Sequence, residues 1–388
     1  MITSWPWWFA WRSARPAERQ PAKRAKRARK RVGARGFMMG DIGRGGLFLE
    51  RPPARFPPGS AKACYRGRFA LFVPLHAWQD GASVTMSALQ QRSTSMALAA
   101  ALSLAGCSFD QYALDRLTSG FAAGAEAFAN EDDPELVRYS MPITLKAMEA
   151  VLLRDPENTD VLTAAAAAFS LYGYAFVQRD AQKLEYVNYR AFLETQERAL
   201  RLFLRARDYG LRSLEVRHPG IAVALLRDPF RAVEVLSTED VDAAYWCAGA
   251  WGLAISAGRD RPELLADIDA VRALLRASLI LEESYGEGAL HRAMIVVEGL
   301  PEIMGGSTER AREHFRRAIE LSGGQVAETY VSLAENVALP AQDQEEFVQL
   351  LTRALEIDLD ARPRLRLSNR LAQSRARELL EQLDDLFL

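Results

Sequence analysis

The sequence has little cysteine and little histidine for its length. Only three cysteines and four histidines occur among 388 residues, and none has another histidine or cysteine at the spacing of a structural zinc site. The chain also lacks a Walker phosphate loop and the HExxH, CxxC and GxSxG motifs. Those motifs would have indicated nucleotide hydrolysis, metalloprotease chemistry, dithiol exchange or a serine nucleophile. We therefore predict no catalytic residue, no metal ion and no cofactor.

Adjacent acids do not restore a catalytic site. Neighbouring residues on a helix point about 100° apart, whereas a catalytic pair of carboxylates must face one cleft. Helix ends and solvated faces explain these acids better. They occur at Asp132/Asp133, Glu282/Glu283, Glu345/Glu346 and Asp384/Asp385.

The formal net charge of −1 hides two regions of opposite sign. Residues 1–85 carry 17 Lys and Arg against four acids, a net +13, and residues 86–106 add only Arg92. Residues 107–388 are therefore at −15. An acidic body of this kind does not favour nucleic acid or an anionic membrane surface as a partner.

Residues 96–107 form a short apolar run that ends in Leu104-Ala105-Gly106-Cys107. This is the form of a bacterial lipobox, with Met86 as an alternative start, Arg92 as the positive n-region and small residues before the cut. Lipid would then be attached to Cys107. The alternative is an alanine-rich buried helix with an incidental cysteine. We favour the lipobox because the sequence turns abruptly polar at Ser108.

The basic leader, residues 1–85, has no sustained helical or strand period, and we expect it to be mostly disordered. Its basic run, residues 23–31, fits a nucleic-acid-binding tail. The competing interpretation is upstream sequence translated from a misplaced start codon. We favour the second, because a nucleic-acid tail ahead of an export signal makes little sense in the cell. Residues 86–106 are then the signal peptide and residues 107–388 the mature domain.

The body is predicted to be all-α, since apolar residues recur at helical spacing almost throughout and no strand alternation is convincing. No segment after Cys107 is expected to be long and apolar enough to cross a membrane. Asp132-Asp133-Pro134-Glu135 and Ser237-Thr238-Glu239-Asp240 have the composition of helix starts. The predicted helices are residues 110–129, 136–153, 159–177, 195–209, 211–218, 241–257, 262–281, 287–300, 308–321, 326–337, 342–357 and 365–386.

Helix endings recur along the body in a way that suggests repeats. Arg317-Ala318-Ile319-Glu320 and Arg353-Ala354-Leu355-Glu356 are similar and lie 36 residues apart. The period is close to the 34 residues of a tetratricopeptide repeat. We predict degenerate tetratricopeptide-like helix pairs in an α-solenoid or bundle, since stacked pairs of this kind offer grooves for ligands and partners.

The body's two tryptophans lie five residues apart on one predicted helix, close to a tyrosine. Large aromatic residues are usually buried, so core packing is one interpretation. The other is an aromatic wall of an apolar ligand cavity, for which Tyr245, Trp246 and Trp251 are the candidates. Cys247 among them is expected to be a core cysteine. His218, His291 and His314 are expected to be solvated or hydrogen-bonded.

Residues 104–387 resemble the T component of TRAP-type transporters, a family of tetratricopeptide-like lipoproteins. The resemblance rests on many short matches in order. They are the lipobox, Asp132–Leu136, Leu145-Lys146, Leu152-Leu153 with Pro156 and Asn158, Tyr174–Val177, Tyr245-Trp246 with Trp251, Phe315 with Ala318-Ile319 and Leu321–Gly323, Tyr330-Val331 with Ala334-Glu335, Phe347 with Leu350-Leu351, Arg366-Leu367 with Asn369 and Leu371–Gln373, and Asp384–Phe387.

This resemblance implies a non-enzymatic, all-helical periplasmic lipoprotein that forms a homotrimer. Its partner would be the periplasmic substrate-binding protein of a TRAP transporter, and a pore through each subunit would accept a hydrophobic ligand. Ser108 after the lipidated cysteine favours the outer membrane. The alternatives are a generic repeat scaffold for envelope assembly that has no small-molecule ligand, and a helical enzyme acting on periplasmic saccharides.

Overall fold

The computed structural model describes residues 124–387. Helices joined by short loops make up this part of the chain, and no strand occurs in it. The all-α prediction is therefore confirmed. Residues 1–85, the signal segment and Cys107 lie outside the described residues, so the lipobox and the proposed boundaries at 86 and 107 stay predictions.

Helix α2 (Pro134–Leu152) begins where the sequence predicts. The Asp133 side chain accepts a hydrogen bond from the backbone N–H of Glu135, and Pro134 occupies the first turn, where its missing N–H costs nothing. Residues three and four apart share one face of a helix, and that face is the buried one here. It consists of Val137, Met141, Leu145, Met148, Val151 and Leu152.

The next helix is longer than predicted. α3 (Thr159–Tyr172) runs through a π-helical segment, η1 (Gly173–Gln178), into α4 (Arg179–Leu184) without a break. The combined helix, Thr159–Leu184, has 26 residues, and an apolar 18-residue window within it has a mean hydropathy of 1.4, which is enough in length and composition to cross a membrane. The expectation that no such segment follows Cys107 was therefore wrong. However, 78% of its apolar window is buried inside the protein, as in a core helix.

Helix α5 (Tyr189–Arg217) also joins two predicted helices into one, because Gly210 does not end it. A Cβ atom at Gly210 would lie 2.7 Å from both Cα and Cβ of Cys247. The glycine is therefore needed for the close approach of α5 to α8 (Val241–Ala257). Capping of the segment before α8 is as predicted, since Ser237 and Asp240 form a capping box.

The remaining helices follow in chain order. Pairs such as α11 with α12 and α13 with α14 pack against each other, but a regular repeat stays a prediction. The predicted helix 262–281 divides in two at Ala266 and Asp267. The bounds are α6 Ile221–Arg227, α7 Pro229–Ala232, α9 Pro262–Leu265, α10 Ile268–Leu281, α11 Ala289–Glu298, α12 Thr308–Ser322, α13 Ala327–Leu333, the π-helical η6 Ala334–Ala338, α14 Gln344–Leu355, α15 Arg366–Glu381 and α16 Leu383–Leu386.

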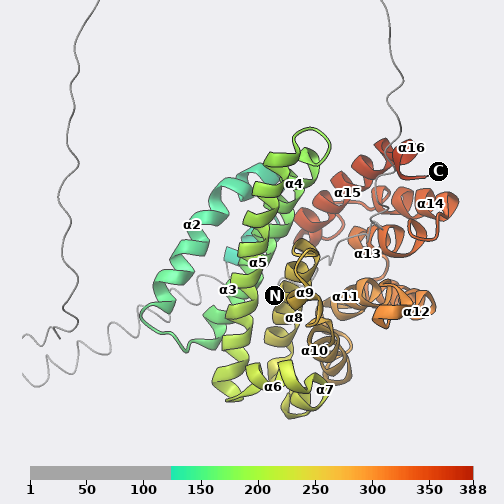
Figure 1. Cartoon of the computed structure of the whole chain (residues 1–388). Coiled ribbons are helices and arrows are strands. Elements are labelled where there is room, and N and C mark those ends of the chain that lie inside the picture. Colours follow the sequence, from blue (N-terminus) through green and yellow to red (C-terminus); the bar gives the residue numbers. More distant parts are fainter. Residues whose placement is uncertain (1–123, 388) are drawn as a thin grey trace, which may run out of the picture. The chain divides into compact units, whose positions relative to one another are not determined.

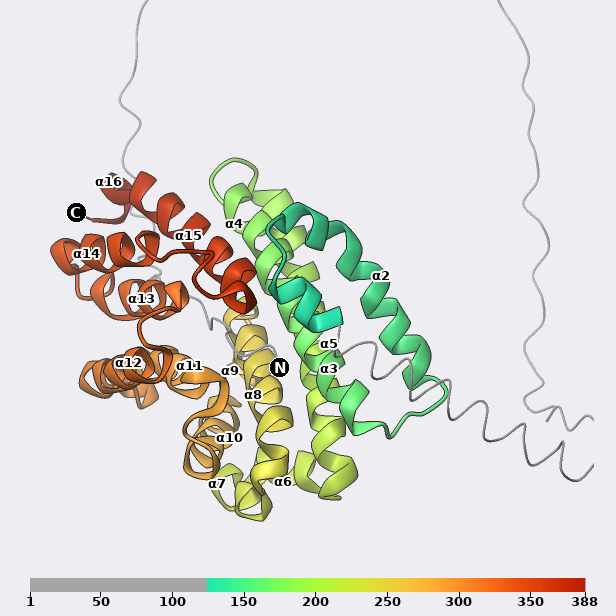
Figure 2. The same ribbon diagram turned by 180° about the vertical axis from the view of Figure 1, so that it is seen from behind.

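Helix α15 returns to the beginning of the described region. Figures 1 and 2 both show it beside α4, although the two are far apart in the sequence. Arg366 donates a hydrogen bond of 3.2 Å to the backbone carbonyl of Asn130, and Arg370 forms an ion pair with Asp132. These contacts join α15 to the residues just before α2. The joined elements form walls of a cavity.

Candidate functional site

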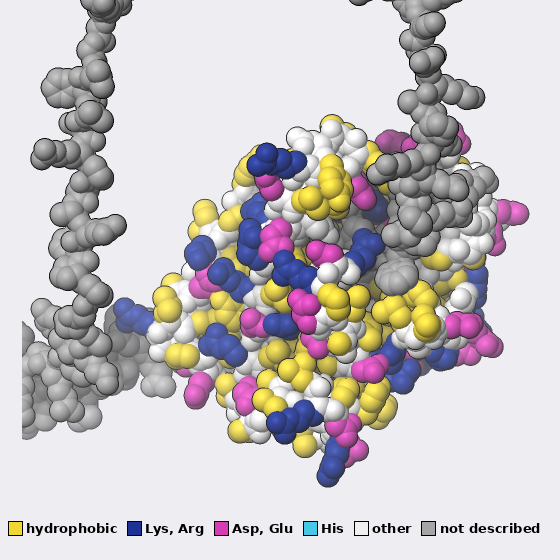
Figure 3. Space-filling model, in the orientation of Figure 1, with side chains coloured by type: hydrophobic (Ala, Val, Ile, Leu, Met, Phe, Trp, Pro, Cys, Tyr) yellow, Lys and Arg dark blue, Asp and Glu magenta, His cyan; other side chains and the backbone are white. Residues whose placement is uncertain are grey.

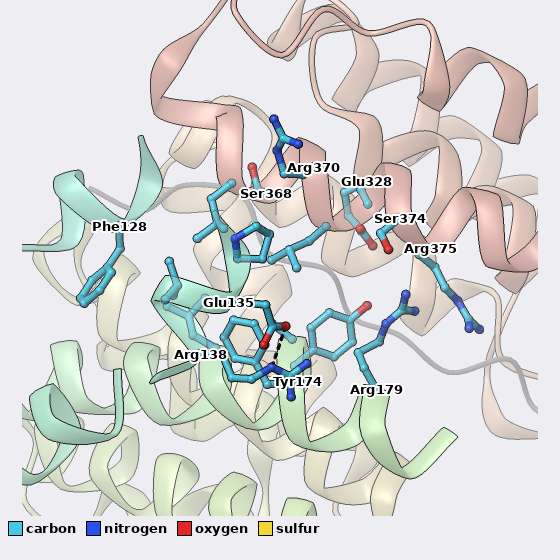
Figure 4. A pocket seen from close by; sticks show the side chains of 18 of the residues that line it. Phe128, Glu135, Arg138, Tyr174, Arg179, Glu328, Ser368, Arg370, Ser374 and Arg375 are labelled. Carbon is cyan, nitrogen blue, oxygen red and sulfur yellow. Dashed lines mark hydrogen bonds and ion pairs between the residues drawn. The ribbon is translucent and has the colours of Figure 1, made fainter. Parts of the chain in front are cut away.

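A cavity of about 380 Å³ lies between α2 and α15, near the beginning and the end of the described region. Its walls come from α2, from the continuous helix α3–η1–α4, from α13 and from α15. Figure 4 shows side chains of these elements facing one another across it. Cavities of roughly 300–1,000 Å³ are typical of small-molecule sites. This cavity is therefore the candidate functional site.

Both π-helical segments contribute to this region. η1 places Tyr174 and Phe176 on the cavity wall. η6 carries Glu335, whose carboxylate accepts a hydrogen bond from the wall residue Arg375. Gly173 in η1 is needed because a Cβ there would lie 2.7 Å from the ring of Phe203. π-helical turns are rare and occur often at functional sites.

Basic side chains outnumber acidic ones on the cavity wall, with seven Lys and Arg and three Glu. This imbalance is unusual for a body whose net charge is strongly negative. On the face drawn in Figure 3, by contrast, basic and acidic side chains are interspersed. The basic residues are Arg138, Arg179, Lys183, Arg364, Arg370, Arg375 and Arg377, and the acidic ones are Glu135, Glu328 and Glu378.

Three of these cations gather around one carboxylate. Glu378 accepts from Arg179 at 2.8 Å, and its oxygens lie 3.6 Å from Lys183 Nζ and 3.8 Å from Arg375 Nη1. Arg375 also pairs with Glu335 at 2.6 Å. The side chains of Arg179 and Arg375 are only 12% and 16% exposed. Their charges are therefore poorly solvated.

Burial shifts the pKa values of the charged groups in this cluster. Burial raises the pKa of Glu335 to about 8, although the charge of Arg375 acts in the opposite direction. Burial lowers the pKa of Arg179, and the neighbouring positive charge of Arg375 lowers it further. Glu335 therefore holds its proton more readily than a solvated glutamate does, and the charge of this cluster changes with pH.

A phenol completes the polar end of the cavity. The pKa of Tyr174 lies well above its usual value, first because the side chain is buried and then because Glu328 is negatively charged. Tyr174 therefore keeps its proton and can act as a hydrogen-bond donor. Figure 4 shows its hydroxyl pointing toward the guanidinium of Arg179.

The rest of the wall is largely apolar. The guanidinium of Arg138 lies 4.9 Å from the centre of the Phe176 ring, so its flat face covers the aromatic ring instead of adding a free charge. Arg138 is also paired with Asp180 at 2.7 Å. The apolar residues of the wall are Phe128, Ala129, Pro134, Val137, Met141, Leu171, Ala175, Phe176, Leu367, Leu371 and Ala372.

Comparison with known proteins identifies the family. The family model of the TRAP transporter T-component matches residues 130–387. This chain belongs to the TRAP transporter T-component family. It is also 30% identical over 311 residues to an uncharacterized protein of Treponema pallidum (strain Nichols), a match that covers 75% of this chain and 96% of that protein.

The T-component match includes almost the entire cavity. Of the wall residues, only Phe128 and Ala129 lie before its first residue. The closing contacts of Arg366 and Arg370 also fall inside it. The cavity thus lies almost entirely within the region that the family model matches.

The three aromatic residues proposed for the ligand wall lie elsewhere. Tyr245, Trp246 and Trp251 are 0%, 4% and 1% exposed and are not among the residues that line this cavity. The Tyr245 ring packs edge-on against Trp246 at 5.0 Å, and Trp251 Nε1 donates to Asp267 at 3.1 Å. Their role as a ligand wall in this T-component stays a prediction.

The other polar candidates have structural partners. Asp132 pairs with Arg370, Asp133 caps α2, and His218 lies 3.0 Å from Asp240. His291 and His314 contact each other. No cluster of metal-ligating side chains occurs in residues 124–387.

Cys247 is a free, fully buried thiol, as predicted. Burial raises the pKa of this thiol to about 12. It therefore stays protonated and behaves as a core side chain.

Sequence reasoning missed the cavity as a site. Tyr174, Phe176 and Glu335 occur in the segments that carry the resemblance, but no role was assigned to them. A usable signal was the concentration of arginines on α15, including Arg370, Arg375 and Arg377. Arginines at this density on a helix with an apolar face indicate ion pairs with acidic side chains. Only the fold shows which acidic residues these are.

Proposed function

We propose that this protein is a non-enzymatic accessory component of a TRAP transport system, which docks the periplasmic substrate-binding protein and passes a small-molecule ligand through its internal cavity. The family match supports the transport context. The single observation that carries the ligand part is the cavity of about 380 Å³ between α2, η1, α4 and α15. A protein that served only as a scaffold would have no need of a cavity of this size.

The cellular setting is part of the same proposal. A lipid on Cys107 would hold the protein at a membrane, preferably the outer membrane, with the helical domain in the periplasm. Several acyl chains anchor a lipoprotein stably where a single chain does not. The assembly would be a homotrimer, as the resemblance implies.

The proposal is tested by affinity capture of the full chain from the membrane fraction of its host, followed by native mass spectrometry. Expected products are a complex of three copies with the substrate-binding protein of a TRAP system and an N-terminal peptide that begins with acylated Cys107. A mixture of purified chain and that substrate-binding protein at 10–100 μM (on the order of a weak transient complex) should form the same complex. Absence of any association in both experiments would reject the docking role and favour the generic scaffold.

A further inference from the structure

Three exposed arginines form a row along α5. Arg198, Arg205 and Arg212 lie seven residues apart, which on an α-helix is almost two full turns and about 10.5 Å. Their side chains therefore lie one behind another on the same side of the helix.

Each guanidinium in this row lies over an aromatic ring. The distances to the ring centres are 5.9 Å for Arg198 over Tyr172, 5.5 Å for Arg205 over Phe169 and 5.7 Å for Arg212 over Tyr209. Stacking of this kind orients a guanidinium and leaves most of its N–H groups available to a carboxylate. Arginines held in this way lose less conformational freedom on binding than mobile ones do.

Two members of the row form no ion pair within residues 124–387. Arg198 donates to the Tyr172 hydroxyl at 3.3 Å, and Arg212 donates to the Pro156 carbonyl at 2.8 Å. Both acceptors are uncharged. Because a guanidinium has five N–H donors, each of these arginines can still bind a carboxylate.

The acids one turn before these two arginines are already paired. Glu194 contacts Arg190 at 3.2 Å, and Asp208 contacts Arg207 at 2.8 Å. The missing carboxylates would therefore have to come from another molecule.

Helix α2 adds a second row beside the first. Tyr139, Lys146 and Leu153 are also seven residues apart and are 74%, 72% and 84% exposed. The carboxylate of Glu149 contacts both Lys146, at 2.5 Å, and Arg205 of α5, at 3.1 Å. One carboxylate thus bridges the two rows, so they lie on one surface.

The composition of this surface is that of a protein interface. Arginine and tyrosine are enriched among the residues that dominate binding between proteins. Since the inner face of α2 is buried in the core, the exposed Tyr139 and Leu153 make this helix apolar on a second side as well. Such side chains would become buried under a partner.

The charge pattern favours a protein over a continuous anionic surface. Residues 107–388 carry a net charge of −15, and Glu149 and Asp208 lie close to the arginines. These negative charges would repel a lipid surface or a nucleic acid. A protein can instead place single carboxylates opposite single arginines.

We propose that this α2–α5 surface binds an acidic protein face whose carboxylates are about 10 Å apart, to match the arginine row. None of the side chains in the two rows lines the cavity. In the transport system the partner is the substrate-binding protein, so this assignment rests on the proposed function.

The first experiment titrates the purified full chain with two synthetic helical peptides. One carries glutamate at every seventh position, and the other carries lysine at the same positions. The glutamate peptide should bind on the order of tenfold more tightly at low salt and lose this advantage at about 1 M NaCl, where charges are screened. Equal affinities for the two peptides at low salt would overturn the proposal.

Variants locate the binding surface. Arg198→Gln with Arg212→Gln should lower the affinity for the glutamate peptide on the order of tenfold and leave the melting temperature unchanged, because neither arginine has an acid partner to lose. Arg316→Gln with Arg353→Gln is the matched control, since it removes two exposed arginines from α12 and α14 and changes the net charge equally. Full affinity in the Arg198 and Arg212 variant would overturn the proposal.

Vesicles of phosphatidylglycerol test the competing partner. A chain with Cys107→Ser, which has no lipid of its own, should sediment with them to the same extent whether or not Arg198 and Arg212 are replaced. Sedimentation that depends on these arginines would overturn the assignment to a protein.

Titration with the substrate-binding protein separates this inference from the proposed function. A complex that weakens in the Arg198 and Arg212 variant but not in the control supports both. A complex of full strength in that variant supports docking and overturns this surface. Binding of the glutamate peptide through the two arginines without any binding of the substrate-binding protein rejects docking and supports the acid-binding surface.

Discussion

Arg366 and Asn130 are 236 residues apart in sequence and share a hydrogen bond of 3.2 Å. The contact joins the last long helix to the turn before α2. Both helices line the same cavity, so residues separated by most of the domain form one wall. A cavity assembled in this way exists only after the whole domain has folded.

Close packing of α5 against α8 depends on Gly210. Gly210→Ala places a Cβ atom 2.7 Å from the Cα of Cys247, and backbone cannot move aside as a flexible side chain does. We expect a loss of about 1–3 kcal/mol in the free energy of unfolding, measured by urea denaturation. Gly124→Ala is the control, because nothing lies within 4 Å of its Cβ position and stability should stay equal or rise slightly. Equal free energies of unfolding for the two variants would show that α5 and α8 can move apart without loss of stability.

Glu335 should make the protein less stable as pH rises. Its pKa is about 8 in the folded state and near 4.3 when unfolded, so the folded state binds more protons between these values. The contribution is present below about pH 4 and is lost as pH rises through 8. Glu335→Gln should remove this decline, which is checked by urea midpoints from pH 5 to 9. An unchanged pH slope in the variant would mean that the carboxylate is ionised throughout.

The contact between His291 and His314 should make the protein less stable as pH falls. Their Nδ1 atoms are 2.8 Å apart, and Glu283 lies 3.2 Å from Nε2 of His291, with Arg317 paired to the same glutamate. Burial and then the charge of His291 lower the pKa of His314 to about 4, against about 6.5 in an unfolded chain.

The unfolded state therefore binds more protons in the window from pH 6.5 to 4, and stability falls as pH falls through it. His314→Gln should flatten this part of the stability curve, measured by thermal melts at half-unit intervals. His218→Gln is a useful comparison, because His218 lies in a separate contact with Asp240. A curve with the wild-type slope in the His314 variant would show that His314 does not cause the loss of stability in this pH window.

Trp251 is expected to matter for stability. Trp251→Ala removes a side chain that is 1% exposed and should cost roughly 3–5 kcal/mol, measured by denaturation. Trp251→Phe keeps most of the packing and loses the hydrogen bond to Asp267. The phenylalanine variant should therefore lose less stability than the alanine variant. Equal losses in both variants would mean that Trp251 contributes mainly through its hydrogen bond and not through packing.

Cys107→Ser tests the lipobox directly. The variant should be found in the soluble fraction and incorporate no labelled fatty acid, whereas the wild type should carry the label and fractionate with membranes. Wild-type protein without label would refute lipidation at this residue.

Local chemistry made much of the fold predictable. Asp133 and Pro134 begin α2 as expected, the Ser237–Asp240 box is formed, and α8 has the predicted bounds. In each case the determining contacts lie within one helical turn. Gly210 misled the prediction because glycine often ends a helix, and its packing against Cys247 cannot be read from neighbouring residues.

The cavity could not be predicted for a related reason. Its wall combines residues from 128–141, 171–183, 328 and 364–378, and helical periodicity says nothing about which faces meet. Glu335 illustrates the difficulty. Its hydrogen-bond partner is Arg375, 40 residues later, so the residues next to Glu335 do not reveal the pair. The aromatic cluster around Trp246 was conspicuous in composition, but it packs in the core.

The π-helical segment η1 also sets the rotational phase of α4. Its hydrogen bonds span five residues instead of four, so the turn contains one residue more than an α-helical turn. Removing a single residue from η1 would restore ordinary α-helical geometry and rotate α4 by about 100° relative to α3. Arg179 and Lys183 would then turn away from Glu378, although the chain would differ by only one residue. The one extra residue in η1 is therefore what orients Arg179 and Lys183 toward Glu378.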